Sequence, residues 1–202
     1  MAKGLSLLHR FLKRSFDILA SAIGLILTGW VIVLASIAAS IDTRKGGFFT
    51  QQRIGKNGIP FKVVKIRTMR DIPSIHTTVT ASNDLRITPL GHFFRKTKID
   101  ELPQLINVFL GQMSFVGPRP DVSGFADRLT GEDKIILSVR PGITGPATLE
   151  YRKEEELLAG HDNPEKYNNE VIFPDKVRLN REYVLNYRLW KDIKYMLQTI
   201  FG

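Results

Sequence analysis

The sequence predicts a mainly helical α+β fold, with one N-terminal membrane helix followed by a small α/β domain that contains a short β-hairpin and surface amphipathic helices. Two observations lead to this prediction. Residues 18–41 form an apolar run of 24 residues without a charge. The chain beyond it alternates short strand patterns with helical patterns between turns that contain Gly and Pro. We therefore expect two units, a membrane-embedded segment at 1–42 and a domain outside the membrane at 43–202.

The composition excludes several classes of site. The chain has 202 residues and no cysteine, which excludes disulfide scaffolds, thiolate zinc sites and cysteine nucleophiles. Its four histidines include no i, i+4 pair, so a histidine-rich metal site is not expected. With 29 Lys and Arg against 20 Asp and Glu, the net charge is +9. A basic chain favours polyanionic partners: nucleic acid, an anionic membrane face or a phosphorylated substrate.

The apolar run is long enough to enter a membrane. As a helix at about 1.5 Å per residue it reaches roughly 36 Å, against about 30 Å for a bilayer core. Basic residues flank both ends: Lys3, Arg10, Lys13 and Arg14 before it, and Arg44, Lys45, Arg53 and Lys56 after it. Because positive charge marks the cytoplasmic side, a re-entrant helix that bends near Thr28-Gly29 and returns would satisfy both flanks. A single-pass anchor is the alternative.

The first elements after this run are predicted to form a β-hairpin. Residues 48–51 have a short strand pattern, Asn57-Gly58 is a hairpin turn signal, and residues 61–67 alternate as the returning strand. Residues 71–88 are rich in Ser, Thr, Asp and Asn, which predicts an exposed loop. Thr88 followed by Pro89 predicts the start of a helix that extends to about residue 96, with a cap residue before a first-turn proline.

A second helix is expected to start at Asp100-Glu101 and to stop at Gly111. Its apolar face would consist of Leu102, Leu105, Ile106 and Phe109. Residues 116–120 and 140–146 are rigid turns that contain Gly and Pro, and residues 154–159 and 175–188 have helical patterns.

Residues 189–201 combine aromatic residues and lysines in a helical pattern. Such an amphipathic helix is typical of a helix on a membrane surface, and it is equally typical of a packed C-terminal helix. The periodicity favours neither.

Asp100 and Glu101 are the candidate catalytic pair. Adjacent carboxylates at a helix start are often only a cap and a first-turn acid. Here three arginines on constrained backbone accompany them, which suits a multiply charged phosphate or diphosphate: Arg95, Arg119 and Arg140. An aspartate beside arginines and a helix start is expected to have a lowered pKa and to stay ionised.

An ionised Asp100 can attack phosphorus and form an acyl-phosphate. Glu101 is a suitable ligand for Mg²⁺, a hard cation that takes one or two carboxylates together with phosphate oxygens. A phosphate site beside a membrane segment further suggests that one substrate is a lipid phosphate.

Five blocks of sequence carry a family resemblance. They are FFTQQRIG at 48–55, KIRTM at 65–69, IDELPQLINV at 99–108, MSFVGPRP at 113–120 and VRPGITG at 139–145. With these blocks in order behind a basic-flanked apolar segment, the chain resembles the monotopic bacterial sugar transferases, which are small phosphoglycosyl transferases that initiate polysaccharide and glycoprotein assembly. The resemblance covers nearly the whole chain.

This resemblance implies an enzyme that moves a sugar 1-phosphate from a UDP-sugar to polyprenyl (undecaprenyl) phosphate and releases UMP. The product would initiate capsule, O-antigen or glycoprotein glycan synthesis. Asp100 would be the nucleophile of a ping-pong reaction through a covalent aspartyl-phosphosugar intermediate, and Glu101 would bind the Mg²⁺ cofactor. Phosphate contacts would come from arginines: Arg95 and Arg119 first, then Arg67, Arg140 and Arg152, which are also candidates for a nucleotide-binding or structural role.

The resemblance also implies a location. The N-terminal segment would be a re-entrant helix in the bacterial inner (cytoplasmic) membrane, and 43–202 would be a catalytic domain on the cytoplasmic face. Two positions depart from the family pattern. The family commonly bends its membrane helix at a Ser-Pro pair, where this chain has Gly29-Trp30. It often follows the 139–145 block with Trp-Ala-Gln, where this chain has Pro146-Ala147-Thr148. If this loop contacts the sugar, the donor would differ from the common ones.

Two other functions fit parts of the sequence. A non-catalytic, basic, membrane-tethered binding module explains the charge and the apolar segment, but leaves the carboxylate pair among arginines a coincidence. A membrane phosphohydrolase would use the same acyl-phosphate chemistry with water as the acceptor. No nucleic-acid partner is expected, because the basic residues are dispersed and no aromatic-basic motif is present. The expected partners are a UDP-sugar, polyprenyl phosphate and the lipid bilayer, and a homodimer is compatible with the apolar segment.

Overall fold

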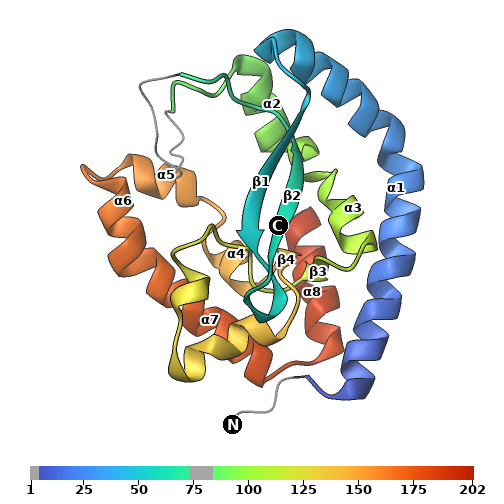
Figure 1. Cartoon of the computed structure of the whole chain (residues 1–202), viewed down its shortest axis with the longest axis vertical. Coiled ribbons are helices and arrows are strands. Elements are labelled where there is room, and N and C mark those ends of the chain that lie inside the picture. Colours follow the sequence, from blue (N-terminus) through green and yellow to red (C-terminus); the bar gives the residue numbers. More distant parts are fainter. Residues whose placement is uncertain (1–4, 73–83) are drawn as a thin grey trace.

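A long N-terminal helix and two small sheets organise the structure, a computed structural model that describes residues 5–72 and 84–202 (Figure 1). Most of the remaining chain is helical. In Figure 1 the long helix α1 runs along one side of the molecule, the β1–β2 hairpin lies near the middle, and α5, α6 and α7 lie on the opposite side. The mainly helical α+β class predicted from the sequence is therefore confirmed in its coarse form.

Helix α1 spans Leu7–Thr43, 37 residues, and its cap Ser6 accepts a hydrogen bond from the His9 amide. It is the one helix in the described residues that is long and apolar enough to cross a membrane. The helix continues without interruption through Thr28-Gly29, where the Thr28 hydroxyl donates to the Gly24 carbonyl at 2.7 Å. A re-entrant course for this segment therefore stays a prediction.

Strands β1, Phe48–Ile54, and β2, Pro60–Ile66, form the predicted antiparallel hairpin, with Phe48 opposite Ile66. The connection contains a short 3₁₀ turn in which Asn57 and Gly58 both have positive φ, 58° and 77°. The Asn-Gly signal is confirmed, because these two residue types tolerate that conformation best. Both strands include residues beyond those predicted, since pairing extends to the Ile54–Pro60 pair.

Helix α2, Pro89–Thr97, begins as predicted. The Thr88 hydroxyl accepts from the Gly91 amide at 2.9 Å, which satisfies a donor at the helix start. The loop predicted for residues 71–88 lies mostly in 73–83, outside the described residues.

The second predicted helix starts later than expected. Asp100 and Glu101 lie in a 3₁₀ turn, Ile99–Glu101, and α3 spans only Gln104–Phe109, followed by Gly111 with φ 81°. The predicted apolar face is partly wrong, because Ile106 and Phe109 are exposed. The buried face instead combines Leu105 and Val108 with the polar Gln104 and Asn107.

Asn107 explains this orientation of α3. Its side-chain amide donates to the Lys62 carbonyl at 2.8 Å, and its Oδ1 accepts from the Val64 amide at 3.1 Å. These bonds attach α3 to the edge of β2. A polar side chain that satisfies two strand groups is therefore turned inward in place of Ile106 or Phe109.

The two Gly-Pro turns lie side by side. Strand β3, Ser114–Val116, pairs in parallel with β4, Gly142–Thr144, and the Gly117 amide donates to the Thr144 carbonyl at 2.9 Å. The backbones approach so closely that a Cβ on Gly142 would lie 2.2 Å from the Gly117 nitrogen. Glycine is required here for close approach of two chains.

The C-terminal part is helical: α4, Pro146–Glu150; α5, Glu154–Ala159; α6, Pro164–Tyr167; a π turn, Asn168–Ile172; α7, Phe173–Leu185; and α8, Leu189–Phe201. The helix predicted at 154–159 is confirmed, and the one predicted at 175–188 begins and ends earlier. Helix α8 buries Asp192 but exposes Trp190, Ile193 and Leu197. One face of α8 is therefore packed, and an apolar face stays open.

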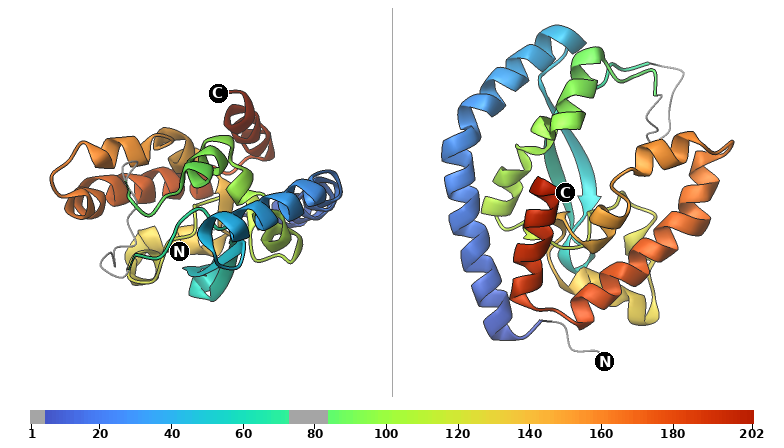
Figure 2. Two further views of the ribbon diagram at one scale, coloured as in Figure 1. Left: turned by 90° about the horizontal axis from the view of Figure 1, so that it is seen from above. Right: turned by 180° about the vertical axis from the view of Figure 1, so that it is seen from behind.

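The first and last helices, α1 and α8, are joined by a buried ion pair. Lys13 of α1 donates to the Asp192 carboxylate of α8 at 2.5 Å, and Asp192 also accepts from the hydroxyls of Tyr183 and Tyr187. Seen from behind, α8 runs beside the first half of α1 (Figure 2). This contact fixes α1 against the rest of the molecule.

Candidate active site

Asp100 and Glu101 lie where the chain turns from α2 into α3. Lys98 ends α2 in the left-handed conformation, φ 59°, so the following turn carries both carboxylates into the interior. Asp100 is only 7% exposed, and its Oδ1 is buried without a hydrogen-bond partner in the part of the chain that the structure describes. A buried polar atom without a partner is rare unless it serves a ligand or a reaction.

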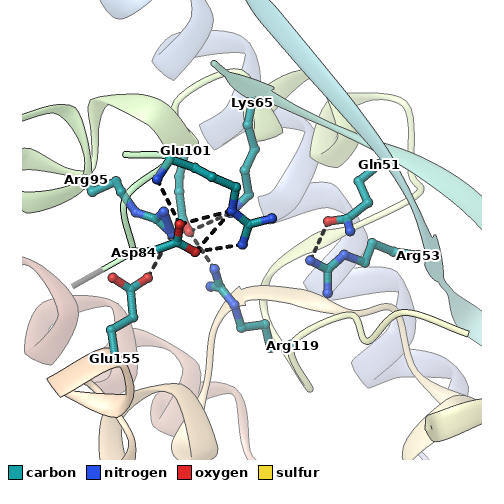
Figure 3. A network of polar contacts seen from close by, with 9 residues as sticks. Gln51, Arg53, Lys65, Asp84, Arg95, Glu101, Arg119 and Glu155 are labelled. Atoms are coloured by element: carbon teal, nitrogen blue, oxygen red, sulfur yellow. Dashed lines mark hydrogen bonds and ion pairs between the residues drawn. The ribbon is translucent and has the colours of Figure 1, made fainter. Parts of the chain in front are cut away.

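Two cations hold Glu101. Its Oε1 accepts from the Arg119 guanidinium at 2.5 Å and from the Lys65 ammonium at 3.1 Å (Figure 3). Arg119 comes from the turn after β3, and Lys65 from β2. The hairpin, the dyad turn and the Gly-Pro turn therefore meet at one carboxylate.

The two carboxylates have opposite electrostatic environments. Burial alone raises the pKa of Glu101, but Arg119 and Lys65 outweigh it and hold that pKa well below its usual value. Burial, and then the charge of Glu101, raise the pKa of Asp100. The prediction that Asp100 has a lowered pKa is therefore wrong: the charges of Lys65 and Arg95 lower this pKa, but burial and Glu101 outweigh them.

The reason lies in where the arginines bind. Arg119 is paired with Glu101, and Arg95 of α2 donates to Glu155 of α5 at 2.9 Å (Figure 3). Asp100 forms an ion pair with neither. Cations therefore offset the cost of burying a charged carboxylate less at Asp100 than at Glu101.

Two further charged residues extend the site. Arg53 of β1 donates to the Gln51 side chain at 2.6 Å and to the Pro120 carbonyl at 3.2 Å. Burial and the charge of Arg119 lower the pKa of Arg53 to about 10. Burial raises the pKa of Asp121, which follows the same Gly-Pro turn, to about 6.

Sequence reasoning missed several residues of this network as site residues: Lys65, Arg53, Gln51, Asp121 and Glu155. The signal available was a charge in the middle of an apolar strand pattern, as at Lys65 between Val64 and Ile66. A charge at such a position usually has a partner inside the protein.

The predicted arginines divide into two groups. Arg95 and Arg119 lie close enough to influence the dyad. The hydrogen bonds of the other three go elsewhere: Arg67 to the carbonyls of Gly46 and Phe48, Arg140 to that of Gly111, and Arg152 to that of Gln198. The structure does not join these three to the dyad.

The dyad fits a magnesium ion that has few protein ligands and completes its coordination with water and substrate phosphate. Within the described part of the chain, Asp100 has a buried oxygen without a hydrogen-bond partner, and Glu101 is paired through Oε1 only. No group of three His, Cys, Asp or Glu side chains gathers around a possible metal site in residues 5–72 and 84–202. The donors suit an ion that keeps water and binds substrate phosphate, which is how Mg²⁺ is commonly held.

Comparison with known proteins identifies similar chains. A family model described as bacterial sugar transferase matches residues 8–202. A UDP-glucose:undecaprenyl-phosphate glucose-1-phosphate transferase from Caulobacter vibrioides is 32% identical over 194 residues, which cover 93% of this chain and 68% of that protein. The exopolysaccharide production protein ExoY from Rhizobium meliloti is 34% identical over 206 residues, with coverages of 93% and 83%.

Other relatives are longer. A UDP-glucose:undecaprenyl-phosphate glucose-1-phosphate transferase from Escherichia coli is 35% identical over 202 residues, which cover 98% of this chain but 41% of that protein. The chain thus spans about two fifths of the length of this and similar relatives. The similarity includes both α1 and the dyad turn, because the family match extends from residue 8 to residue 202.

Proposed function

The chain belongs to the bacterial sugar transferase family, and from this membership we propose that it transfers a sugar 1-phosphate from a UDP-sugar to undecaprenyl phosphate and releases UMP. The relatives named above support the reaction class. The observation that carries the proposal is a buried Asp100, whose Oδ1 has no hydrogen-bond partner among the described residues, next to a Glu101 that is held ionised by two cations.

Asp100 is the proposed nucleophile. Its carboxylate attacks the phosphorus that carries the sugar, a phosphorus–oxygen bond forms, and the bond to the other phosphate of the UDP-sugar breaks, so that UMP leaves. An oxygen of undecaprenyl phosphate then attacks the same phosphorus and displaces Asp100, which is regenerated as a carboxylate. Burial of Asp100 supports a covalent intermediate, since a site that excludes water protects an acyl-phosphate from hydrolysis.

The cations around the dyad have a proposed role in charge stabilisation. Arg119 and Lys65 neutralise Glu101 in the absence of substrate, and the Arg119 side chain is 40% exposed, so it is open to a ligand. A diphosphate entering here would accept hydrogen bonds from Arg119, with Arg53 and Arg95 nearby in the same network. Guanidinium groups suit this task because their planar donors match phosphate oxygens.

Glu101, with the free oxygen of Asp100, would hold Mg²⁺. When bound, the ion would supply charge neutralisation between an anionic nucleophile and an anionic phosphate. Glu101 suits the role because its lowered pKa keeps it ionised over the whole physiological range.

The location follows from α1. We place α1 in the bacterial inner membrane as a re-entrant helix, with residues 43–202 on the cytoplasmic face. The supporting features are basic residues on both flanks of α1 and a row of exposed apolar side chains along it, of which Leu19, Ile26 and Trp30 are examples. This arrangement brings the dyad to the face where a lipid phosphate is available.

Mass spectrometry of the intact chain tests the covalent step. The full chain is incubated with Mg²⁺ and a panel of UDP-sugars without lipid acceptor. We expect a mass increase of one sugar phosphate with at least one donor, and its loss on addition of undecaprenyl phosphate. Asp100→Asn should show no adduct, and Asp162→Asn, which changes an exposed aspartate, should behave as the parent chain.

Two results would count against the proposal. An adduct that persists in Asp100→Asn would move the nucleophile elsewhere. Formation of free sugar phosphate, with no lipid diphosphate product after the acceptor is added, would instead favour a phosphohydrolase.

A further inference from the structure

A second group of basic side chains gathers where α1 begins, apart from the dyad. Arg10 comes from the second turn of α1, Lys56 from the β1–β2 connection, and Arg140 from the segment before β4. In Figure 1 the start of α1 and the β1–β2 connection both lie in the lower half of the view. These side chains line one pocket together with others: Lys13, Asp17 and Ser138.

The pocket has more positive than negative charge. Arg10, Lys56 and Arg140 form no ion pair with any carboxylate of the described residues, 5–72 and 84–202. Lys13 is neutralised by Asp192. That leaves three cations against the single carboxylate of Asp17.

Like charges in the pocket act on one another. Burial, and then the charges of Arg140 and Arg10, lower the pKa of Lys56. Asp17 is the carboxylate in the pocket lining, and its Oδ1 already accepts from the Ser114 hydroxyl and the Phe115 amide at 3.0 and 3.1 Å. An anion in the pocket would remove the repulsion.

The pocket also contains an unused hydrogen-bond donor. The Ser138 hydroxyl is buried and has no hydrogen-bond partner in the described part of the chain. Arg140 uses only Nε, in a 2.7 Å bond to the Gly111 carbonyl, and no other hydrogen bond of its guanidinium is formed in these residues. A hydroxyl and a guanidinium edge that both face a cationic pocket are suited to the oxygens of a phosphate.

The surroundings indicate where such a phosphate comes from. Leu7, Leu8 and Phe11, on the first turns of α1 beside Arg10, are between 65% and 83% exposed. They begin the exposed apolar surface of a helix that is apolar enough to enter a membrane. A phosphate held at Arg10 would therefore have apolar surface next to it for acyl chains.

We infer that this pocket binds the phosphate of an anionic membrane lipid, through Arg10, Lys56, Arg140 and the Ser138 hydroxyl, with the acyl chains along the first turns of α1. Glu101 interacts with other cations, Lys65 and Arg119, so this site is separate from the dyad. The inference does not rest on the proposed transfer reaction, and it assigns Arg140 a phosphate contact outside the dyad.

Lipid binding by the full chain in a neutral detergent tests the inference. Native mass spectrometry measures retention of phosphatidylglycerol and of phosphatidylcholine. The test variant is Arg10→Gln/Lys56→Gln, and the matched control, Lys134→Gln/Lys166→Gln, removes the same charge from exposed lysines elsewhere. We expect about thirtyfold weaker phosphatidylglycerol binding in the test variant, since each cation near an anionic lipid surface contributes roughly a factor of five.

The control variant should bind phosphatidylglycerol like the parent chain, and Ser138→Ala should weaken binding by a smaller factor. Equal losses in the test and control variants would show unspecific charge attraction and overturn the inference. Saturable binding of inorganic phosphate or glycerol 1-phosphate, as tight as that of the lipid and lost in the test variant, would assign the pocket to a soluble phosphate and overturn the lipid assignment. UMP release by the test variant is measured separately, so failure of the lipid site and failure of the transferase proposal remain distinguishable.

Discussion

Asp100 and Glu101 are neighbours in the chain, yet their surroundings act on them in opposite directions. Glu101 receives Arg119 and Lys65 on one oxygen, and these cations lower its pKa. Asp100 is buried beside that negative charge, which raises its pKa. A pair of carboxylates with separated pKa values can divide two roles, one permanently ionised and one poised to react.

The pH dependence of activity tests this division. Arg119→Met and Lys65→Met each remove one cation from Glu101 and so raise its pKa. The acid limb of the kcat/KM profile for UMP release reports Asp100, because this nucleophile must be ionised and its pKa is raised, whereas that of Glu101 is lowered. Lys65 also lowers the pKa of Asp100, so the limb should move to higher pH in Lys65→Met. In addition, Arg119→Met should lower kcat/KM by roughly 10²-fold, which is typical of losing one donor to a developing charge.

A variant at an exposed lysine, Lys134→Met, provides the control and should leave the acid limb unchanged. If the limb stays in place for Lys65→Met, the ionisation of Asp100 is not what the profile reports.

At the scale of elements, the contact between the two Gly-Pro turns positions Arg119. The β3–β4 pair is short, but it is extended by the Gly117-to-Thr144 bond and by a bond of 2.8 Å from the Gly142 amide to the Pro118 carbonyl. Backbone packed on backbone leaves no room for side chains at these glycines. The position of the guanidinium beside Glu101 therefore depends on two residues without side chains.

Gly142→Ala should destabilise the chain by about 1–3 kcal/mol, the usual cost of inserting a methyl group into a packed region. Its Cβ would lie 2.2 Å from the Gly117 nitrogen, whereas a Cβ at Gly46 would have no atom within 4 Å. Thermal unfolding in detergent compares Gly142→Ala with Gly46→Ala. Equal melting temperatures would contradict the close packing of the two turns.

At the scale of the whole molecule, α1 is joined to the rest by buried polar contacts as well as apolar ones. Lys13 binds Asp192, and Asp17 binds Ser114 at the start of β3. The Lys13–Asp192 pair joins the first part of α1 to the first part of α8, the two helices that lie next to each other in the view from behind in Figure 2. The buried side of α1 is thus polar in its first half, at Lys13, Asp17 and Ser21, and mainly apolar further along, while its other side exposes large apolar residues.

Lys13→Met should therefore destabilise the fold by about 3–5 kcal/mol, because it leaves the Asp192 charge buried and unpaired. The matched variant Lys45→Met breaks the exposed Lys45–Asp71 pair and should cost less than about 1 kcal/mol. The side chains of the first pair are 10% and 6% exposed, against 51% and 63% for the second. Denaturant unfolding of both variants in detergent measures the difference, and equal losses would show that the buried pair does not join α1 to α8.

Local patterns predicted much of the fold. Thr88-Pro89, Asn57-Gly58 and Gly111 mark a helix start, a turn and a helix end, because each depends on the conformational preferences of one or two residues. Prediction failed for α3, where Asn107 turns inward to bind β2. These two hydrogen bonds are long-range contacts, and the periodicity of apolar residues in a helical segment does not predict them.

The sequence by itself determined the family, the apolar helix, the hairpin and the carboxylate pair, because each depends on motifs of contiguous residues. Only the tertiary structure decided which charges meet. It paired Arg119 and Lys65 with Glu101, directed Arg95 to Glu155, and set Arg140 in a second basic pocket. Electrostatic effects depend on distance in space and on burial, which is why the raised pKa of Asp100 followed first from its burial in the fold, to which the charge of its chain neighbour Glu101 adds.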